Sequence, residues 1–245
     1  VDDGHTETIA ASTTYTFNGT ISNLVRLICV DFAGTADPNL PVSADLRQKA
    51  AVVQTGNGAF ALTLSGFAYI RGVKLNAGSG ATSTGADIFL GPTGAAHAFI
   101  FDECELGILS TGVTAEIFIG GTGTGIDDIR IELINTDLRR SAAGQSCFLR
   151  TCRFIWRGGT LVGTLPTTLF TGNVDSVCMA HIIGVDLGGL GSGRNLVDVG
   201  FAAPSIIAFI GCKLGASVAV TTGTFSGPGG MRVFLINCDS GDTNY

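Results

Sequence analysis

Charged residues are scarce in this sequence: Asp, Glu, Lys and Arg make up 14% of its 245 residues, against about 25% in an average soluble domain. The net charge is −6, and no basic run exceeds the pair Arg139-Arg140. The electrostatic footprint of a nucleic-acid-binding protein is therefore missing. Because a soluble domain that works alone needs a charged coat, we expect this chain to bury much of its outer surface in an assembly.

Long apolar segments are also lacking. No stretch approaches the roughly 18 residues that a membrane span requires, and we expect no membrane insertion. The opening segment, Val1–Glu7, has no basic region followed by an apolar core, so it does not have the pattern of a signal peptide. It also lacks an initiator Met, which indicates a processed product or one part of a longer chain.

Motifs of familiar catalytic and metal sites are absent as well. The sequence has no HExxH, GxSxG or GxxxxGK pattern and no CxxC pair. A zinc site, a hydrolase nucleophile or a phosphate-binding loop is therefore not indicated. The three histidines, His5, His97 and His181, are far apart in the chain. We predict no metal and no cofactor.

Gly, in contrast, is abundant, with 36 residues, and it separates short apolar runs as in a chain of many strands and tight turns. Eight segments share one pattern: an apolar residue, two variable positions, a small residue, a charged residue and, in most copies, a large apolar residue. The small residue is Cys, Val or Thr. The eight copies are Leu27–Phe32, Ile70–Leu75, Phe101–Leu106, Leu133–Leu138, Leu149–Phe154, Ile182–Leu187, Phe209–Leu214 and Leu235–Ser240.

This repetition predicts an all-β fold, a right-handed parallel β-helix, in which each repeat is one coil and like positions stack in columns along the axis. Most small residues recur at a period of about 26 to about 33 residues, a length that accommodates three short strands and three turns. The step from Thr136 to Cys152 is much shorter and breaks this period. Either Cys152 lies on a different face of its coil, or the repeat carries a deletion.

Residues 1–50 differ from the rest, so we divide the chain into an N-terminal capping segment, 1–50, and a β-helix, 51–245. An open first coil exposes unpaired strand edges and needs a cap. Within the first segment, Ser43–Ala51 fits either a short helix or an extended stretch. No cap follows the last predicted strand, near Asn237, and we expect another subunit or a further segment to cover it.

The chain has seven cysteines, an odd number that cannot be fully paired within one molecule. We expect them to be mostly buried and reduced, and we assign four of them to the small position of the repeat: Cys104, Cys152, Cys212 and Cys238. Cys104, Cys212 and Cys238 should share one inward column, with Lys213 and Asp239 pointing outward beside them.

A charged column is predicted one residue beyond the small position, and it reads Lys74, Glu105, Asp137, Arg153, Asp186, Lys213 and Asp239. The simplest interpretation is a solvated ladder of outward side chains with weak ion pairs. The alternative pairs Glu105 with Asp137 on adjacent coils, since a retaining glycosidase needs two carboxyl groups about 5 Å apart. Glu105 and Asp137 are therefore the candidate catalytic residues if the protein is an enzyme.

Three aromatic residues, Phe148, Phe154 and Trp156, lie close together in the sequence. Strand alternation predicts that all three share one face with Cys152. Packing in the core explains such a cluster better than a platform for binding sugars.

The stretch Leu27–Gly34, followed by Leu40–Leu46 and Thr55-Gly56, resembles segments of structural proteins of tailed bacteriophages. The opening Val1–Thr8 and the later Tyr69–Gly80 are similar in kind. The resemblance covers mostly the segment Val1–Gly80 and carries no catalytic residue. It implies a virion protein, a class in which β-helices occur as head decorations, tail spikes and fibres.

We therefore expect a non-enzymatic virion structural protein, a homotrimer on the particle surface that contacts the major capsid protein or other virion proteins. Capsid decoration is the first expectation. A tail spike or fibre that binds or cleaves a host-surface glycan is the alternative, and a carbohydrate-active β-helix enzyme of non-viral origin comes third. An acidic pair lining a groove would favour the enzymes, whereas a large flat apolar face would favour assembly.

Overall fold

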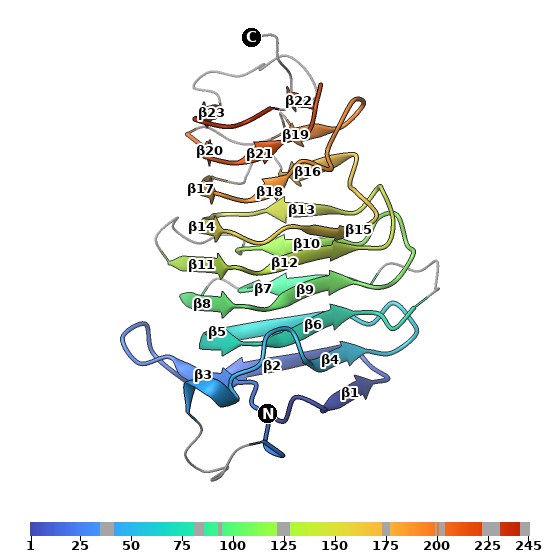
Figure 1. Cartoon of the computed structure of the whole chain (residues 1–245), viewed down its shortest axis with the longest axis vertical. Helices are drawn as coiled ribbons and strands as arrows, with labels where there is room; N and C mark the ends of the chain where they lie inside the picture. Colours follow the sequence, from blue (N-terminus) through green and yellow to red (C-terminus); the bar gives the residue numbers. More distant parts are fainter. Residues whose placement is uncertain are drawn as a thin grey trace.

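The computed structural model describes residues 1–34, 42–80, 86–92, 95–121, 128–172, 177–198, 200, 204–221 and 231–240. This part of the chain contains 23 β-strands and one short 3₁₀ helix, η1 (Ser43–Asp45). The strands stack in layers along the long axis of the molecule, in the order of the chain (Figure 1). Within the described ranges, no helix has the length and apolar character needed to cross a bilayer.

Each layer is one coil that contributes strands to three sheets. The first sheet contains β1 (Thr6–Ile9), β4 (Ala51–Thr55), β6 (Val73–Ala77), β9 (Glu105–Ile108), β12 (Asp137–Arg140) and β15 (Leu161–Gly163). A bridge from Thr160 to Asp186 extends this face to the paired strands β18 (Asp186–Leu187) and β21 (Lys213–Leu214).

The second and third sheets are joined because one long strand, β5 (Leu62–Arg71), runs through both. The second sheet also contains β2 (Thr13–Phe17), β7 (Ile88–Leu90), β10 (Glu116–Ile119), β13 (Ser146–Leu149), β16 (Thr168–Thr171), β19 (Asn195–Val197) and β22 (Ala219–Thr221). The third sheet also contains β3 (Val25–Ile28), β8 (His97–Asp102), β11 (Ile129–Ile134), β14 (Cys152–Arg157), β17 (Cys178–Ile183), β20 (Ile206–Ile210) and β23 (Arg232–Ile236).

All pairings between these strands are parallel. The described strands form eight coils: β1–β3 make coil one, β4 and β5 make coil two, and three strands in chain order make each later coil, up to β21–β23 in coil eight. The predicted all-β fold with parallel sheets is therefore confirmed. The arrangement fits a parallel β-solenoid.

A corner with left-handed backbone conformation follows the third-sheet strand in each of coils two to eight. The corner residues, which occupy the third position of the repeat, have φ between +47° and +77° and are Gly72, Glu103, Asn135, Gly158, Gly184, Gly211 and Asn237. Gly and Asn tolerate this conformation better than other residues. The corner therefore explains why most copies place Gly or Asn directly before the small residue.

The small residue after the corner supplies a hydrogen-bond donor to the third sheet. Its hydroxyl or thiol group donates to a backbone carbonyl near the end of the strand that lies one layer below the strand leading into the corner, as in the pairs Thr136 to Phe101 (3.1 Å), Cys104 to Ile70 (3.3 Å) and Cys212 to Ile182 (3.3 Å). Buried carbonyl groups need such partners. Thr and Cys thus combine small volume with a donor that Val lacks.

The predicted cysteine column is confirmed. Cys104, Cys212 and Cys238 occupy equivalent inward positions, and Lys213 and Asp239 lie outward and exposed beside the last two. None of the seven cysteines forms a disulfide; six are buried, and Cys238 is half-buried. The expectation of packed, mostly buried cysteines is therefore confirmed, and their reduced state stays a prediction.

Two residues assigned to the repeat lie elsewhere, because Cys152 and Arg153 belong to β14 of the third sheet. Cys152 pairs in register with Cys178, so the first explanation of the short step, a different face, is correct. The true copy in this coil is Trp156–Leu161, which has Gly159 at the small position and an uncharged residue at the charged one. Arg153 is consequently not part of the charged column.

The aromatic cluster is also divided between two faces. Phe154 and Trp156 on β14 are fully buried, whereas Phe148 on β13 is half-buried and points outward from the second sheet. The prediction of one shared face is wrong because a corner at Arg150 and Thr151 interrupts the alternation between the two strands.

Residues 1–34 contribute coil one itself: β1 pairs with β4, and β2 and β3 pair with β5. Neither alternative for Ser43–Ala51 describes the whole segment: a single 3₁₀ turn over Ser43–Asp45 is followed by irregular chain that bends at Gln48 and Lys49 before β4. The capping role of 1–50 stays a prediction. Residues 241–245, at the end that we expected to lack a cap, lie outside the described residues.

Candidate functional site

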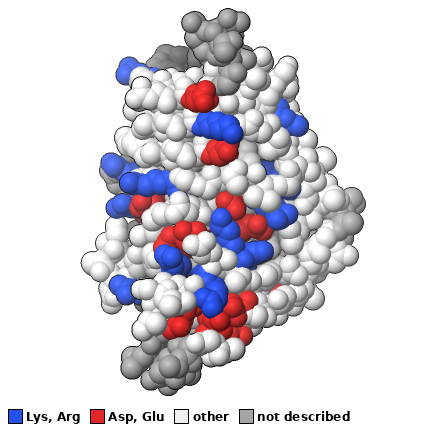
Figure 2. Space-filling view, viewed as in Figure 1, with Lys and Arg blue, Asp and Glu red and all other residues white. Residues whose placement is uncertain are grey.

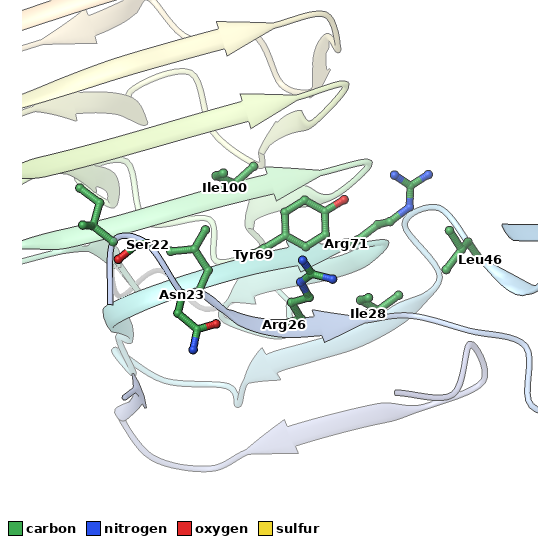
Figure 3. A pocket seen from close by; sticks show the side chains of 10 residues that line it. Ser22, Asn23, Arg26, Ile28, Leu46, Tyr69, Arg71 and Ile100 are labelled. Atoms are coloured by element: carbon green, nitrogen blue, oxygen red, sulfur yellow. The ribbon is translucent and has the colours of Figure 1, made fainter. Parts of the chain in front are cut away.

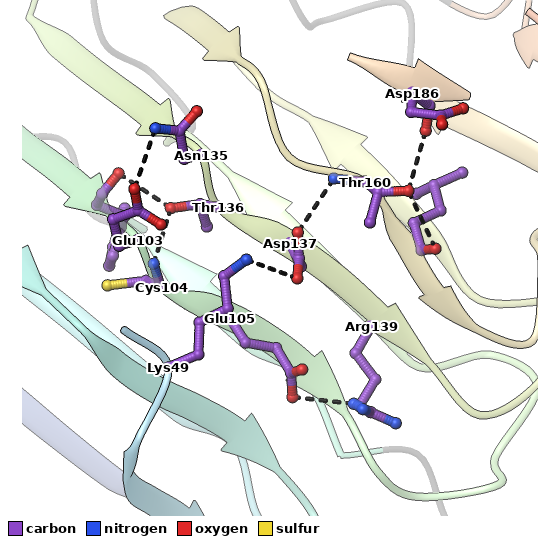
Figure 4. Close-up of polar contacts among 12 residues, drawn as sticks. Lys49, Glu103, Cys104, Glu105, Asn135, Thr136, Asp137, Arg139, Thr160 and Asp186 are labelled. Carbon is purple, nitrogen blue, oxygen red and sulfur yellow. Dashed lines mark hydrogen bonds and ion pairs between the residues drawn. The ribbon is translucent and has the colours of Figure 1, made fainter. Parts of the chain in front are cut away.

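The predicted carboxylate pair lies side by side on the first sheet, because Glu105 of β9 and Asp137 of β12 are partners in register. Each carboxylate has its own cation (Figure 4). Arg139 donates through Nε to Oε1 of Glu105 at 2.9 Å, and Lys49 donates through Nζ to Oδ2 of Asp137 at 2.8 Å. The backbone N–H of Thr160 gives Asp137 a further hydrogen bond of 3.1 Å.

These two carboxylates are less exposed than a solvated ladder requires. The side chain of Glu105 is 7% exposed and that of Asp137 is 14% exposed, so the expectation of open, outward side chains is wrong for this pair. Farther along the charged column, the side chains are exposed to solvent as predicted: Lys213 Nζ and Asp186 Oδ2 lie 3.6 Å apart, and the two side chains are 65% and 55% exposed. Figure 2 shows that charged side chains of both signs gather along this face of the molecule.

The ion pairs give Glu105 and Asp137 a structural role. Lys49 and Asp137 are 88 residues apart in the chain, so their contact fastens the connection before β4 to coil five. Each carboxylate is occupied by an ion pair with its own cation, whereas the two carboxyl groups of a glycosidase flank the scissile bond of a substrate. The observed partners therefore suit a link between coils better than an acid–base pair.

A second group of charged side chains, not among the predicted candidates, lies on the outer surface of the second sheet. Asp87 precedes β7, and Glu116 begins β10 in the next coil, where its backbone N–H donates to Oδ1 of Asp87 at 2.9 Å. The hydroxyl group of Ser146 donates to Oε1 of Glu116 at 2.8 Å, and that of Thr171 lies 3.4 Å from the same oxygen.

Burial dominates the electrostatics of this group. It is the largest cause that raises the pKa of Asp87 and of Glu116 above the usual values of carboxyl groups. Burial also lowers the pKa of the nearby Arg150, although attraction to Glu116 and Asp87 opposes that change. Two neighbouring carboxyl groups with raised pKa beside a half-buried guanidinium are a more suitable acid–base pair than Glu105 and Asp137.

An aromatic column borders the same group. Phe89 and Phe118 stack with ring centroids 4.7 Å apart, and Phe148 follows at 5.4 Å from Phe118. The guanidinium carbon of Arg150 lies 4.4 Å from the centroid of the Phe118 ring. One sequence signal could have identified this column: each of the three strands places Phe at the outward position between two inward apolar residues.

A third feature is a hollow of about 610 Å³ on the outer surface of the third sheet, in coils one to three (Figure 3). The turn before β3 contributes Ser22 and Asn23, and the strand itself contributes Arg26. Tyr69 and Arg71 of β5 form the adjoining wall. No carboxylate is among the described residues that line it.

The wall formed by Tyr69 and Arg71 is held by Asp102, which lies beside them on the neighbouring strand β8. The phenol of Tyr69 donates to Oδ2 of Asp102 at 2.5 Å, and Arg71 forms an ion pair with the same oxygen. Burial, followed by the hydrogen bond to Asp102, raises the pKa of Tyr69. Because Asp102 is itself buried, both side chains are fixed in place.

Among the described residues, no group of three or more His, Cys, Asp or Glu side chains is arranged to hold a metal ion. The chain matches no protein-family model, no curated protein and no solved structure. Its function is therefore argued from the geometry described above.

Proposed function

We propose that this protein is a non-enzymatic structural component of a bacteriophage virion, a capsid decoration protein that acts as a homotrimer on the particle surface. The resemblance of the segment Val1–Gly80 to phage structural proteins suggests the class. Stacked coils suit it, because they give a stiff body whose outer faces are free to make contacts. One observation carries the proposal: an apolar outer face on the third sheet in coils six to eight.

This apolar face consists of the outward side chains of β17, β20 and β23, which are Met179, His181, Ile183, Ile206, Ala208, Ile210, Arg232, Phe234 and Ile236. Seven of these nine side chains are apolar, and Phe234 and Ile236 are each 43% exposed. Large contiguous apolar patches on a protein surface mark sites of association. We assign this face to contacts between copies of the chain around a three-fold axis, which leaves the other surfaces for capsid proteins.

We also propose that the coils wind in the right-handed sense, which makes the solenoid a right-handed parallel β-helix. Each coil connects parallel strands of one sheet by a crossover through the other two sheets. Such connections are right-handed in about 98% of proteins because of the twist of the strands.

Sedimentation of a charged variant tests the assembly. We expect the wild type to sediment as a trimer at micromolar concentration and to bind capsid shells that lack it. Ile183→Lys combined with Ile210→Lys should leave a folded monomer, with association weakened by about a hundredfold or more, since two charges would be buried without partners.

Ile134→Lys is the matched control, because Ile134 occupies the same outward column in coil four, outside the apolar face. It should leave the trimer intact. A wild-type protein that stays monomeric and binds no capsid shell would contradict the proposal, and so would a control that dissociates as readily as the double variant.

A tail spike or fibre that binds or cleaves a host-surface glycan is the second candidate function. Asp87 and Glu116 favour it, since glycosidases use two neighbouring carboxyl groups in different protonation states. Cleavage of a glycan by the wild type, lost in Glu116→Gln but kept in Glu105→Gln, would promote this candidate above the structural one.

A further inference from the structure

The hollow beside Arg26 differs in charge from the rest of the protein. The chain carries a net charge of −6, yet the described lining of the hollow includes two arginines and no carboxylate. Arg71 is already paired with Asp102. Arg26, in contrast, forms no ion pair or side-chain hydrogen bond with any described residue. The hollow therefore presents a guanidinium group that is available to a ligand.

Polar and apolar groups surround this cation on different sides. The turn that carries Ser22 and Asn23 is closed by two reciprocal backbone hydrogen bonds of 3.0 Å between Thr20 and Asn23. Arg26 and Tyr69 are partners in register on neighbouring strands, and Ile100 follows Tyr69 in the next strand. Figure 3 shows Arg26 and Tyr69 next to each other, with Ser22 and Asn23 at one side of them.

We propose that this hollow binds a carboxylate-bearing saccharide. The carboxylate is held by the guanidinium group of Arg26, whose planar fork matches a carboxylate in two parallel hydrogen bonds. The C–H face of the sugar ring packs against Tyr69 and Ile100. Its hydroxyl groups bond to the side chains of Ser22 and Asn23.

Three features of the hollow agree with such a ligand. A volume of about 610 Å³ lies within the range of roughly 300–1,000 Å³ that is usual for small-molecule sites. A flat ring beside hydrogen-bonding groups suits a sugar, which has apolar faces and polar edges. The hydrogen bond to Asp102 on the neighbouring strand fixes Tyr69, so the platform is formed before the ligand arrives and little conformational entropy is lost on binding.

The inference does not depend on the proposed particle role. The site lies in coils one to three, whereas the proposed trimer contact lies in coils six to eight. The monomeric double variant at Ile183 and Ile210 should therefore bind the same ligand as the wild type. Loss of assembly and loss of ligand binding are separate results, and either proposal can fail without the other.

Titration calorimetry and saturation-transfer NMR with D-glucuronate and D-galacturonate oligosaccharides test the proposal. We expect the wild type to bind at least one of them and Arg26→Gln to bind it about tenfold or more weakly, since a charge-assisted hydrogen bond is lost. Tyr69→Phe keeps the ring and should retain most of the affinity, whereas Tyr69→Ala should not. Each variant is checked for an unchanged melting curve.

Arg153→Gln is the matched control, because Arg153 is an exposed arginine of the third sheet in coil five, outside both the hollow and the apolar face; it should bind like the wild type. Neutral glucose oligosaccharides should not bind. Three results would overturn the proposal: no uronate binding up to roughly 10 mM, a range weaker than most specific recognition; equal affinity of Arg26→Gln and wild type; or inorganic phosphate binding as tightly as uronate, which indicates a general anion site.

Discussion

Coils one to five and coils six to eight differ in how their outer surfaces are stabilised. In the lower coils, ion pairs with buried or half-buried carboxylates join neighbouring strands: Arg71 with Asp102, Arg157 with Glu132 and Arg139 with Glu105. The pair Lys49 and Asp137 joins the connection before β4 to coil five. In the upper coils, the pair Lys213 and Asp186 is exposed, and the outer face of the third sheet is apolar. The inward columns are mostly apolar in both regions, although the lower coils also bury Arg140 and Gln145.

This difference shows that inward and outward residues have separate roles in this fold. Inward residues recur because each coil must bury the same kind of side chain against its neighbours. Outward residues are free to differ, and here the lower coils use them for contacts within the chain. The upper coils instead present the apolar face on the outer surface of the third sheet. We therefore propose that their outward residues serve assembly.

Removal of a buried charge in the lower coils should have the largest effect on stability. Asp102→Asn takes away the partner of Arg71 and weakens the acceptor of Tyr69. We expect a loss of about 2 kcal/mol in the free energy of unfolding, because a half-buried guanidinium remains without an ion pair. Urea denaturation followed by circular dichroism measures this change.

The exposed upper pair provides the control for that measurement. Asp186→Asn removes a carboxylate that is 55% exposed, and we expect a change below about 0.5 kcal/mol. Equal losses in the two variants would show that the contrast between the lower and upper coils does not extend to stability.

The small residues that follow the corners permit a second comparison, between a hydroxyl group and a thiol group at equivalent positions. Thr136→Val in coil five removes a donor to Phe101 and an acceptor for the N–H of Cys104, and it should cost about 1 kcal/mol. Cys212→Val in coil eight removes only a weak S–H donor and should cost less than half as much. Thermal melting of both variants tests the order, and a larger loss at Cys212 would contradict it.

The sequence was sufficient to predict the coils because their signal is repetitive and local. A left-handed corner followed by a small residue recurs in coils two to eight, so the inward column of Cys104 and Cys212 could be located without coordinates. Trp156–Leu161 was missed because Gly159 and Thr160 replace the Cys and the charge that defined the pattern. Leu149–Phe154 was accepted wrongly because a corner between β13 and β14 imitates the same spacing.

The outer contacts could not be predicted in the same way. Register placed Glu105 beside Asp137, but their cations come from Arg139 and from Lys49, and the latter depends on the path of a long connection. The hollow at Arg26 likewise depends on how the turn before β3 lies against two later strands. Such contacts arise from the packing of distant segments, which leaves no periodic signal in the sequence.

The half-buried carboxyl group of Glu116 should make stability depend on pH in a predictable direction. Burial raises its pKa above the usual 4.5, so the folded protein holds this proton more tightly than the unfolded chain. Between the unfolded and folded pKa values the folded state binds more protons, and the free energy of unfolding falls as the pH rises. The stabilising contribution is thus complete below the unfolded pKa and is lost as the pH passes the folded pKa.

Glu116→Gln removes this dependence while keeping an acceptor for Ser146. Relative to the wild type, the variant should gain stability as the pH rises from about 4 to about 7, and urea denaturation at several pH values measures the difference. A difference that stays constant with pH would show that Glu116 is not buried as described.

The smallest expected effect concerns the reactivity of the cysteine thiols. This reactivity measures how accessible each region is to a reagent and requires no change in stability. Burial raises the pKa of Cys104 to about 12 and that of Cys178 to about 12, so neither forms a reactive thiolate at neutral pH. Cys238 in coil eight is half-buried and should be the first thiol modified in the native protein. Mass spectrometry after brief alkylation should find one modified cysteine, and Cys238→Ala should remove that product, whereas Cys104→Ala should not. Rapid modification of Cys104 in the native wild type would mean that the lower coils open as readily as the upper end, which contradicts the contrast between the two regions.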